Sequence, residues 1–392
     1  MSCQYVFITR LIIIAAAAVI VAVTYYKLYL PVNPVFSSIL FKNNLRPFFT
    51  IWCGSACVAG FVSDEYYNLW KYLENEYGWK EVADLSSQNR TWFSNDTIRS
   101  YFHRYFNQIP DLILYNHVFE TARYHSTLKD WELIRHPWFF IEDIHAWTEN
   151  DRVLKKSAMV PMENIVTAFP YKLDEVYCRT SPQGPPQWFS FHRTWLPHSA
   201  SPSFHLPYNR NPKMKIFLSG AITSFYPYRE IFLEMHKKMP VGAPNNTIIY
   251  HPHPGYAPLN NQTRLSAHEA YGRMINTYFA AVTSTSIMNY VLAKIFEIPA
   301  AGALLIVNSE AIPMLARLRL YENVHYVAYN KTNIELIFSD VLSARSFEKY
   351  EKIRWTAHQT IMEYHTTDRR ALFLHNLAMN NYIHSTPKSI AP

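Results

Sequence analysis

The sequence lacks the short motifs of several common enzyme classes. It contains no Gly-x-Ser-x-Gly turn, which excludes the nucleophile elbow of many serine hydrolases, and no Gly-x-x-x-x-Gly-Lys phosphate loop. No Asp-x-Asp pair occurs, so a metal-bound diphosphate has no acidic anchor of that kind. The cysteines show no Cys-x-x-Cys spacing, so neither a zinc ribbon nor a disulfide-dense scaffold is indicated, and a single bridge stays open. They are Cys3, Cys53, Cys57 and Cys178.

Long blocks of one charge are also absent. The formal net charge is +7, yet no run of Lys and Arg typical of nucleic-acid binding appears, so we expect anionic small ligands rather than a nucleic-acid partner. The chain is 49% hydrophobic and 17% charged, with 24 Phe, 28 Tyr and 10 Trp, which is a globular composition. At 392 residues it exceeds what one core usually holds, so two domains are the simplest expectation.

The first thirty residues predict a membrane anchor. An apolar stretch from Leu11 to Val23 follows Arg10 and continues through Thr24, Tyr25 and Tyr26 before Lys27. The segment from about Ile8 to Tyr26 is long enough for a thin or average bilayer. The short N-terminal tail favours a single-pass type II orientation with the body in the lumen of the Golgi or endoplasmic reticulum. A cleaved signal peptide, with a cleavage point near Ala22, is the alternative.

Five Asn-x-Ser/Thr acceptors fit a lumenal glycoprotein. They are Asn89, Asn95, Asn245, Asn261 and Asn330.

Alternating strand and helix patterns predict an α/β fold with two Rossmann-like domains facing a cleft. Expected strands include 111–115, 138–141, 164–168, 214–218, 247–250, 279–283, 303–307 and 324–327. Expected helices include 64–77, 97–105, 228–238, 269–275, 287–296 and 334–342. The predicted organisation is an anchor over 1–30, a stem over 31–50, an acceptor-side domain over 51–180, a proline-rich connection over 181–212, a ligand-binding domain over 213–345 and closing helices over 346–392.

The loop after the strand 214–218 is the first candidate site, because ligands of doubly wound sheets bind beyond the carboxyl ends of the strands. Gly220 lets a ligand approach the backbone, and Arg229 adds a positive charge in the first turns of the next helix. Tyr226 lies between them. An ordinary strand-to-helix turn explains the glycine equally well.

A second candidate segment runs from Lys294 to Ile306, where a helix stops near Pro299 and Gly302 and leads into a buried strand. Glu297 beside that stop could accept hydrogen bonds from ribose hydroxyls. The preceding Thr283-Ser-Thr-Ser286 run places hydroxyls and helix N–H groups together, so Ser284 is a phosphate-binding candidate, although helix capping explains it too.

His253 lies in a His-Pro-His-Pro loop after the strand 247–250 and could donate to a phosphate. A surface loop stiffened by prolines is the alternative.

From Lys213 to Arg370 the chain resembles the donor-binding domain of GT-B glycosyltransferases, and most closely the glycosyltransferase-like domain of the spore-maturation CgeB/YkvP group. That group shows Lys/Arg-x-x-Glu on a helix, then Ala-x-Gly and a strand, a later acidic residue, and a terminal His-Thr-x-x-x-Arg. The matching residues here are Lys294, Glu297, Ala300, Gly302, Glu310, His365, Thr366 and Arg369, together with the turn Tyr226-Pro-Tyr-Arg229. The resemblance implies a GT-B fold whose second domain binds a nucleotide-sugar through Gly220, Tyr226, Arg229, His253, Ser284, Lys294, Glu297, Gly302, Glu310, His365 and Arg369.

In the first half, Asp143 and His145 follow an apolar strand and would point together into the cleft. Either one is a candidate base for an acceptor hydroxyl. Helix capping and metal binding are the alternatives, and metal is the least favoured because no Asp-x-Asp accompanies the pair.

We therefore expect a glycosyltransferase that moves a sugar from a nucleotide-sugar to a hydroxyl on a glycan, protein or lipid, with no metal site and no cofactor beyond the donor substrate. A catalytically silent, membrane-tethered binder with the same fold is the main alternative. A GT-B-type epimerase is less favoured, because epimerases gain little from a membrane anchor.

Overall fold

The computed structural model describes residues 49–51, 64–82, 97–116, 134, 136–141, 165–168, 194–218, 220–238, 248–251, 261–287 and 290–385. The predicted anchor and the predicted stem up to residue 48 lie outside these residues. None of the helices within the described ranges is long and apolar enough to cross a membrane.

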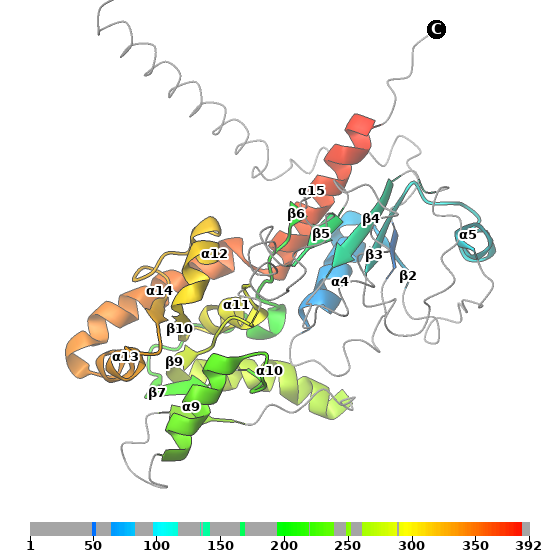
Figure 1. Ribbon diagram of the computed structural model, residues 1–392. Helices are drawn as coiled ribbons and strands as arrows, with labels where there is room; N and C mark the ends of the chain where they lie inside the picture. The colour runs from blue at the N-terminus through cyan, green and yellow to red at the C-terminus, as the bar shows by residue number, and fades with distance from the viewer. Residues whose placement is uncertain are drawn as a thin grey trace, which may run out of the picture. The chain divides into compact units, whose positions relative to one another are not determined.

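Two parallel sheets organise the described part of the chain (Figure 1). The first has the strand order β2-β1-β3-β4-β5-β6 and the second has the order β11-β10-β9-β7-β8. The first sheet consists of β1 (Phe49–Ile51), β2 (Lys80–Val82), β3 (Leu112–Asn116), β4 (His136–Ile141), β5 (Ile165–Thr167) and β6 (Thr194–Trp195). The second consists of β7 (Lys213–Leu218), β8 (Ile248–Tyr250), β9 (Tyr278–Val282), β10 (Leu304–Asn308) and β11 (Val327–Tyr329). The predicted α/β fold with parallel sheets is confirmed.

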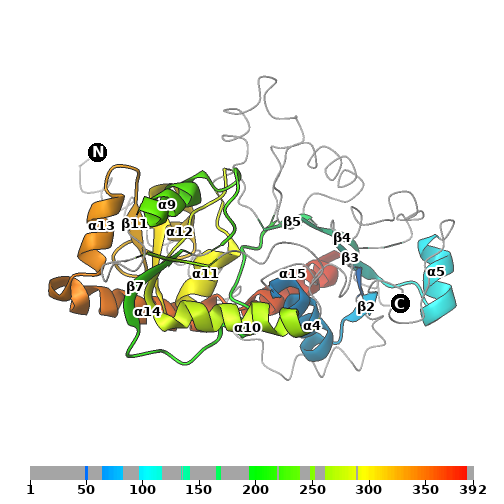
Figure 2. The same cartoon turned by 90° about the horizontal axis from the view of Figure 1, so that it is seen from below.

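The second sheet is buried on both faces. Alternate residues of its strands point to opposite sides, and a hydrophobic core covers each side. Phe217, Ala281 and Leu305 face one core, which also holds residues of α10 (Asn261–Thr277), α11 (Ala293–Ala300) and α12 (Ile312–Arg317). Their neighbours Leu218 and Ile306 face a second core, filled from α9 (Pro227–Lys238) and α13 (Ile334–Val341). Figure 2 shows these helices around the sheet. Burial on both faces explains why the sequences of these strands are continuous runs of apolar residues.

The largest differences from the predicted boundaries occur at three elements. Helix α10 begins at Asn261 rather than at residue 269, because its first turns are polar and carry no apolar period. Helix α11 begins at Ala293 rather than at residue 287, after an extended and buried Tyr290-Val-Leu292. Strand β11 ends at Tyr329, whereas the predicted strand 324–327 starts inside a turn, in which Asn323 has a φ of 60° and the Tyr321 N–H donates to His325 Nδ1 at 2.9 Å.

The closing helices α14 (Phe347–Tyr364) and α15 (Thr367–Ser385) contact elements of both halves of the described chain. Helix α14 packs on α11 and β10, and α15 packs on α4 (Glu65–Tyr77), the first helix of the first half. The remaining helix, α5 (Ile98–Phe106), starts with a capping box between Thr97 and Ser100. The short 3-10 turns are η4 (Pro202–Phe204), η5 (Ser309–Ala311) and η6 (Ala344–Ser346).

A partly buried imidazole on α15 contacts the end of α4 and the residues that follow it. Trp79 Nε1 donates to His375 Nδ1 at 3.0 Å, and the Tyr77 ring stacks on the same imidazole at a centroid distance of 4.5 Å. Burial lowers the pKa of His375 to about 4. The imidazole is therefore neutral in the folded protein at pH values where the unfolded chain already binds a proton.

We expect this difference to destabilise the protein in acid. Above the unfolded pKa of about 6.5 the two states bind the same number of protons, and as the pH falls from there to about 4 only the unfolded state gains one. The free energy of unfolding should be about 2 kcal/mol lower at pH 5 than at pH 7 through this group alone. Denaturant unfolding of wild type and of His375→Gln, which keeps an acceptor for Trp79, measures it. The variant should lose less stability over this range, and parallel pH curves would contradict the assignment.

Candidate functional site

The strand order of the second sheet creates a switch point between β7 and β9. The chain runs outward from β7 to β8 and then crosses to the other side of β7 to form β9. The loops that follow β7 and β9 therefore leave the sheet in opposite directions, and in folds of this kind ligands bind where such loops part at the carboxyl ends of the strands. These two loops hold Gly220 and the Thr283–Ser286 segment.

The loop after β7 requires a glycine. Gly220 has a φ of +101°, and its N–H donates to the Tyr271 hydroxyl at 2.8 Å. A Cβ built at this position would lie 2.4 Å from Arg229 Nη1. Both the backbone angle and the close approach of the guanidinium exclude a side chain here.

Arg229, in the first turn of α9, joins the two loops. It is only 2% exposed, and its guanidinium donates to Ala221 O at 2.9 Å, to Thr283 Oγ1 at 3.1 Å and to Ser284 O at 3.3 Å. The guanidinium also lies 3.9 Å from the centroid of the Tyr226 ring. Arg229 and Tyr226, both predicted to contact a ligand directly, thus lie together in the buried contact between the two loops.

The loop after β9 is buried throughout, with Ser284 fully buried. Asn308, at the end of β10, fixes this loop: its Oδ1 accepts the Thr285 N–H at 2.8 Å and its Nδ2 donates to Thr285 Oγ1 at 2.9 Å. Ser284 Oγ forms no hydrogen bond with any residue that the structure describes. A buried hydroxyl of this kind can bind a ligand at small cost, because no existing bond has to be broken.

Glu310 is an exposed carboxylate at the same edge. Its Oε2 accepts Asn308 Nδ2 at 2.9 Å and its Oε1 accepts the Tyr228 hydroxyl. Burial acts to raise the pKa of Glu310, but the hydrogen bonds from Tyr228 and Asn308, with the nearby Lys331, hold it below its ordinary value. Burial and Glu310 together raise the pKa of Tyr228 to about 12. The site therefore presents a charged acceptor in a fixed position.

Lys294 and Glu297 form a buried ion pair on α11. Lys294 Nζ lies 2.5 Å from Glu297 Oε2, and the two side chains are 12% and 0% exposed. The Lys294 ammonium is also 4.7 Å from the centroid of the Tyr271 ring, whose hydroxyl binds Gly220. Glu297 Oε1 has no hydrogen-bond partner among the described residues. A continuous set of contacts thus joins Lys294 to the two loops of the switch point.

Three predicted site residues lie away from the loops after β7 and β9. Gly302, with a φ of +79°, precedes β10 at the amino end of the sheet, close to Tyr208 and Asn276. His365 is buried at the end of α14, where burial and Arg370 hold its pKa well below its ordinary value. Arg369 is exposed on α15.

The other predicted site residues, His253, Asp143 and His145, lie outside the described residues. Within the described ranges, no three His, Cys, Asp or Glu side chains gather in a way that could hold a metal ion.

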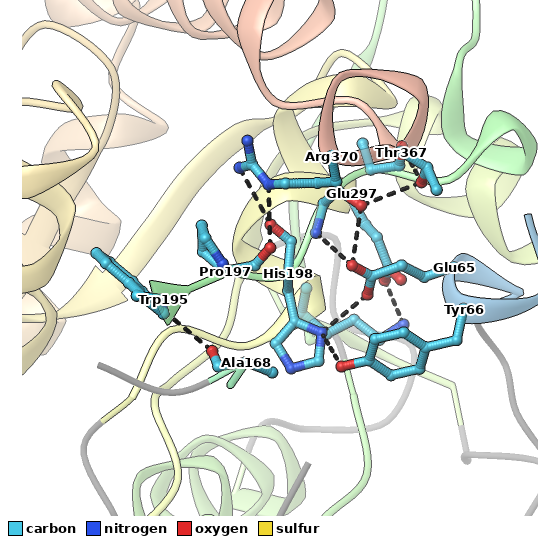
Figure 3. Close-up of polar contacts among 12 residues, drawn as sticks. Glu65, Tyr66, Ala168, Trp195, Pro197, His198, Glu297, Thr367 and Arg370 are labelled. Atoms are coloured by element: carbon cyan, nitrogen blue, oxygen red, sulfur yellow. Dashed lines mark hydrogen bonds and ion pairs between the residues drawn. The ribbon is translucent and has the colours of Figure 1, made fainter. Parts of the chain in front are cut away.

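A second polar cluster, the junction, involves α4, the connection between the sheets and the start of α15 (Figure 3). Glu65, 5% exposed, accepts the Ser199 N–H at 2.6 Å and the Ser199 hydroxyl at 2.9 Å through Oε1. Its Oε2 accepts His198 Nδ1 at 2.8 Å. One carboxylate from the first half therefore binds three donors of the connecting segment.

The start of α15 binds the other side of that segment. Arg370 Nε donates to Pro197 O at 3.0 Å, and Thr367 Oγ1 donates to Ala200 O at 3.0 Å (Figure 3). Arg370 Nη2 also contacts His365 Nδ1 at 2.9 Å. The two places where the chain passes between the halves are thus hydrogen-bonded to each other. No functional role was predicted from the sequence for Glu65, His198 or Arg370.

Comparisons with known proteins agree with this architecture. No family model matches the chain, and no curated protein matches its sequence, so the predicted kinship with the CgeB/YkvP group is not confirmed. The chain is similar in structure to a glycosyltransferase from Rickettsia africae, with a TM-score of 0.51 and 10% identity over 88% of this chain and 100% of that one.

Two further solved structures share the fold. One is an alpha-glucosyltransferase in complex with UDP-glucose and DNA containing an abasic site, with a TM-score of 0.51 and 10% identity over 85% of this chain and 99% of that one. The other is a sucrose-phosphate synthase from Thermosynechococcus elongatus, with a TM-score of 0.50 and 10% identity over 87% and 100%. At this identity the likeness establishes the fold, which is of the GT-B kind.

We predict that Arg229→Lys destabilises the protein by about 2 to 4 kcal/mol, because one ammonium cannot reach the three acceptors that the planar guanidinium serves. Arg273→Lys is the matched control, since Arg273 is exposed and pairs only with Glu269 at 2.7 Å. That variant should change stability by less than about 0.5 kcal/mol. Chemical denaturation of both variants measures the difference, and equal stabilities would show that Arg229 does not hold the loops.

Glu65→Gln should destabilise the junction by about 2 to 4 kcal/mol, since a neutral amide keeps one acceptor oxygen for three donors. Glu74→Gln, on the same helix with a part-exposed Lys71 partner at 2.8 Å, serves as the control. Hydrogen exchange of the 196–201 amides, followed with unfolding midpoints, should increase in Glu65→Gln only. Unchanged exchange in that segment would argue against a clamp at Glu65.

Proposed function

We propose that the protein is a glycosyltransferase that moves a sugar from a nucleotide-sugar donor to an acceptor hydroxyl on a glycan, protein or lipid. One observation carries this proposal: the contacts that run from Lys294 through Tyr271 and Gly220 to Arg229 and Ser284 unite a helix and two loops at the switch point of the second sheet. Sites for nucleotides in doubly wound sheets form at this place.

The donor diphosphate would bind beside the loop after β9 and the first turn of α11. Ser284 Oγ is available as a donor there, and Lys294 supplies positive charge. The Gly220 N–H is already used by Tyr271, so this glycine would contribute close approach rather than a hydrogen bond. Fixed donors of this kind stabilise the charge that develops on a leaving diphosphate.

Hydroxyl groups of the donor would bind to the two glutamates. Glu297 Oε1 is buried and unpaired among the described residues, and it would accept a ribose hydroxyl. Glu310 is exposed, charged and held in place by Tyr228 and Asn308, which suits a second hydroxyl of the same ligand. His253, if it approaches this edge, would contact phosphate, as the sequence predicts.

The acceptor half of the proposal depends on Asp143 and His145, either of which would take the proton from the attacking hydroxyl. The donor serves as substrate, and the proposal needs neither metal nor cofactor, because positioning and cationic groups suffice for the leaving diphosphate. The type II anchor over residues 1–30, with the body in a secretory lumen, stays a prediction.

A panel of UDP-, GDP- and CMP-sugars tests this proposal on the purified full-length chain, with binding followed by calorimetry and turnover by release of the free nucleotide. At least one donor should bind and be hydrolysed or transferred. A folded protein that binds none of these nucleotide-sugars would contradict the proposal. Binding without turnover, over a range of glycan and lipid acceptors, would favour the silent tethered binder instead.

Lys294→Met should weaken binding of that donor by tenfold or more, about 1.4 kcal/mol or above, because it removes the charge beside the diphosphate. Lys237→Met is the control, since Lys237 is exposed near the end of α9 and pairs with Glu234 at 2.8 Å. Donor affinity should be unchanged in the control. Wild-type affinity in a folded Lys294→Met protein would place the donor elsewhere.

A further inference from the structure

The turn after β11 presents one Asn-x-Thr acceptor on the surface. Asn330, Lys331 and Thr332 are all exposed and connect β11 with α13. Of the five sequons, this is the one whose asparagine side chain lies within the described part of the structure. Lys331 at the middle position is not proline, so the acceptor rule is satisfied.

Hydrogen bonds hold the Asn330 side chain with its amide oxygen turned toward the chain. Oδ1 accepts the Thr332 N–H at 2.9 Å, the Thr332 hydroxyl at 2.7 Å and the Asn333 N–H at 3.0 Å. The Asn330 N–H itself donates to Asn333 Oδ1 at 2.7 Å. Every one of these bonds uses the oxygen or the backbone of Asn330, and none uses its Nδ2.

The Nδ2 atom is the one to which a glycan is attached. It belongs to an exposed residue and makes no hydrogen bond with the described residues, so a glycan at this atom would break no contact of the folded turn. Neighbouring residues leave room for a glycan, because Lys331 and Thr332 are exposed as well.

We propose that Asn330 carries an N-linked glycan. Its Nδ2 would lose one proton and form a bond to the anomeric carbon of a glycan, which leaves a lipid-linked diphosphate donor as the diphosphate departs. The turn follows β11, so the glycan would stand at the carboxyl edge of the second sheet, where Lys331 lies 5.6 Å from the centroid of the Tyr228 ring and Tyr228 binds Glu310. The modification requires that the body enters a secretory lumen, and it is independent of whether the protein transfers sugars.

Expression of the full-length chain in a eukaryotic cell with an intact secretory pathway tests this. An amidase that releases N-linked glycans should increase gel mobility, and peptide mass spectrometry should find Asn330 converted to aspartate by that release. Asn330→Asp should migrate as wild type lacking one glycan, because aspartate keeps the acceptor oxygen and the turn but has no amide nitrogen.

Thr332→Ser is the matched control, since it keeps both the hydroxyl donor and the acceptor sequence, and it should retain the glycan. Thr332→Ala should lose it. An unmodified Asn330 peptide, whether or not the other sequons are occupied, would overturn the proposal. Equal mobility of wild type and Asn330→Asp before amidase treatment would do the same.

Discussion

The buried guanidinium of Arg229 is the interaction on which the second half depends. A charge that is 2% exposed is tolerated only where hydrogen bonds replace the lost water, and here the acceptors come from both loops of the switch point. This requirement fixes the distance between the loops and excludes a side chain at Gly220. The two loops are therefore held together before any ligand binds, which lowers the entropic cost of binding between them.

The junction also contains a buried charge, here a negative one, that hydrogen bonds stabilise. Glu65 is a buried carboxylate whose three donors all come from His198 and Ser199, while Arg370 and Thr367 bind carbonyl groups of the same short segment. Removing any one partner leaves another buried polar group without its bond, so the cluster is cooperative. A chain that passes between two sheets at two places gains a defined geometry from such a network, because each passage restrains the other.

The sequence predicted the α/β fold because buried parallel strands leave a strong signal, as in Phe279 to Thr283 and Ala303 to Val307. The residue pattern also pointed to Gly220, Ser284 and Lys294, which follow strands or begin a helix at the edge where doubly wound sheets bind ligands. The family resemblance added Glu310 at the same edge. The resemblance to a known family grouped Gly302, His365 and Arg369 with them, but the structure places these residues at the amino end of the sheet or near the junction.

Other features could not be read from one sequence. Arg229 was predicted to contact a ligand, because the pattern of its helix does not reveal that three acceptors from the two loops surround it. Asn308 and Glu65 carry no local motif, and their importance arises from partners 23 and 134 residues away. Long-range polar contacts of this kind depend on topology, which is fixed only once the strand order is known.

The two glutamates of the candidate edge differ in a way that bears on ligand entry. Glu310 is exposed and both of its oxygens already hold a donor, so a ligand hydroxyl adds to a satisfied group. Glu297 is fully buried, and its Oε1 lacks a partner among the described residues, which costs about 1 to 3 kcal/mol. A donor hydroxyl that binds Glu297 recovers this energy, but the side chain of Glu297, like that of Ser284, has no exposed surface in this structure. Of the two carboxylates, Glu310 is therefore the one that a ligand at this edge contacts first.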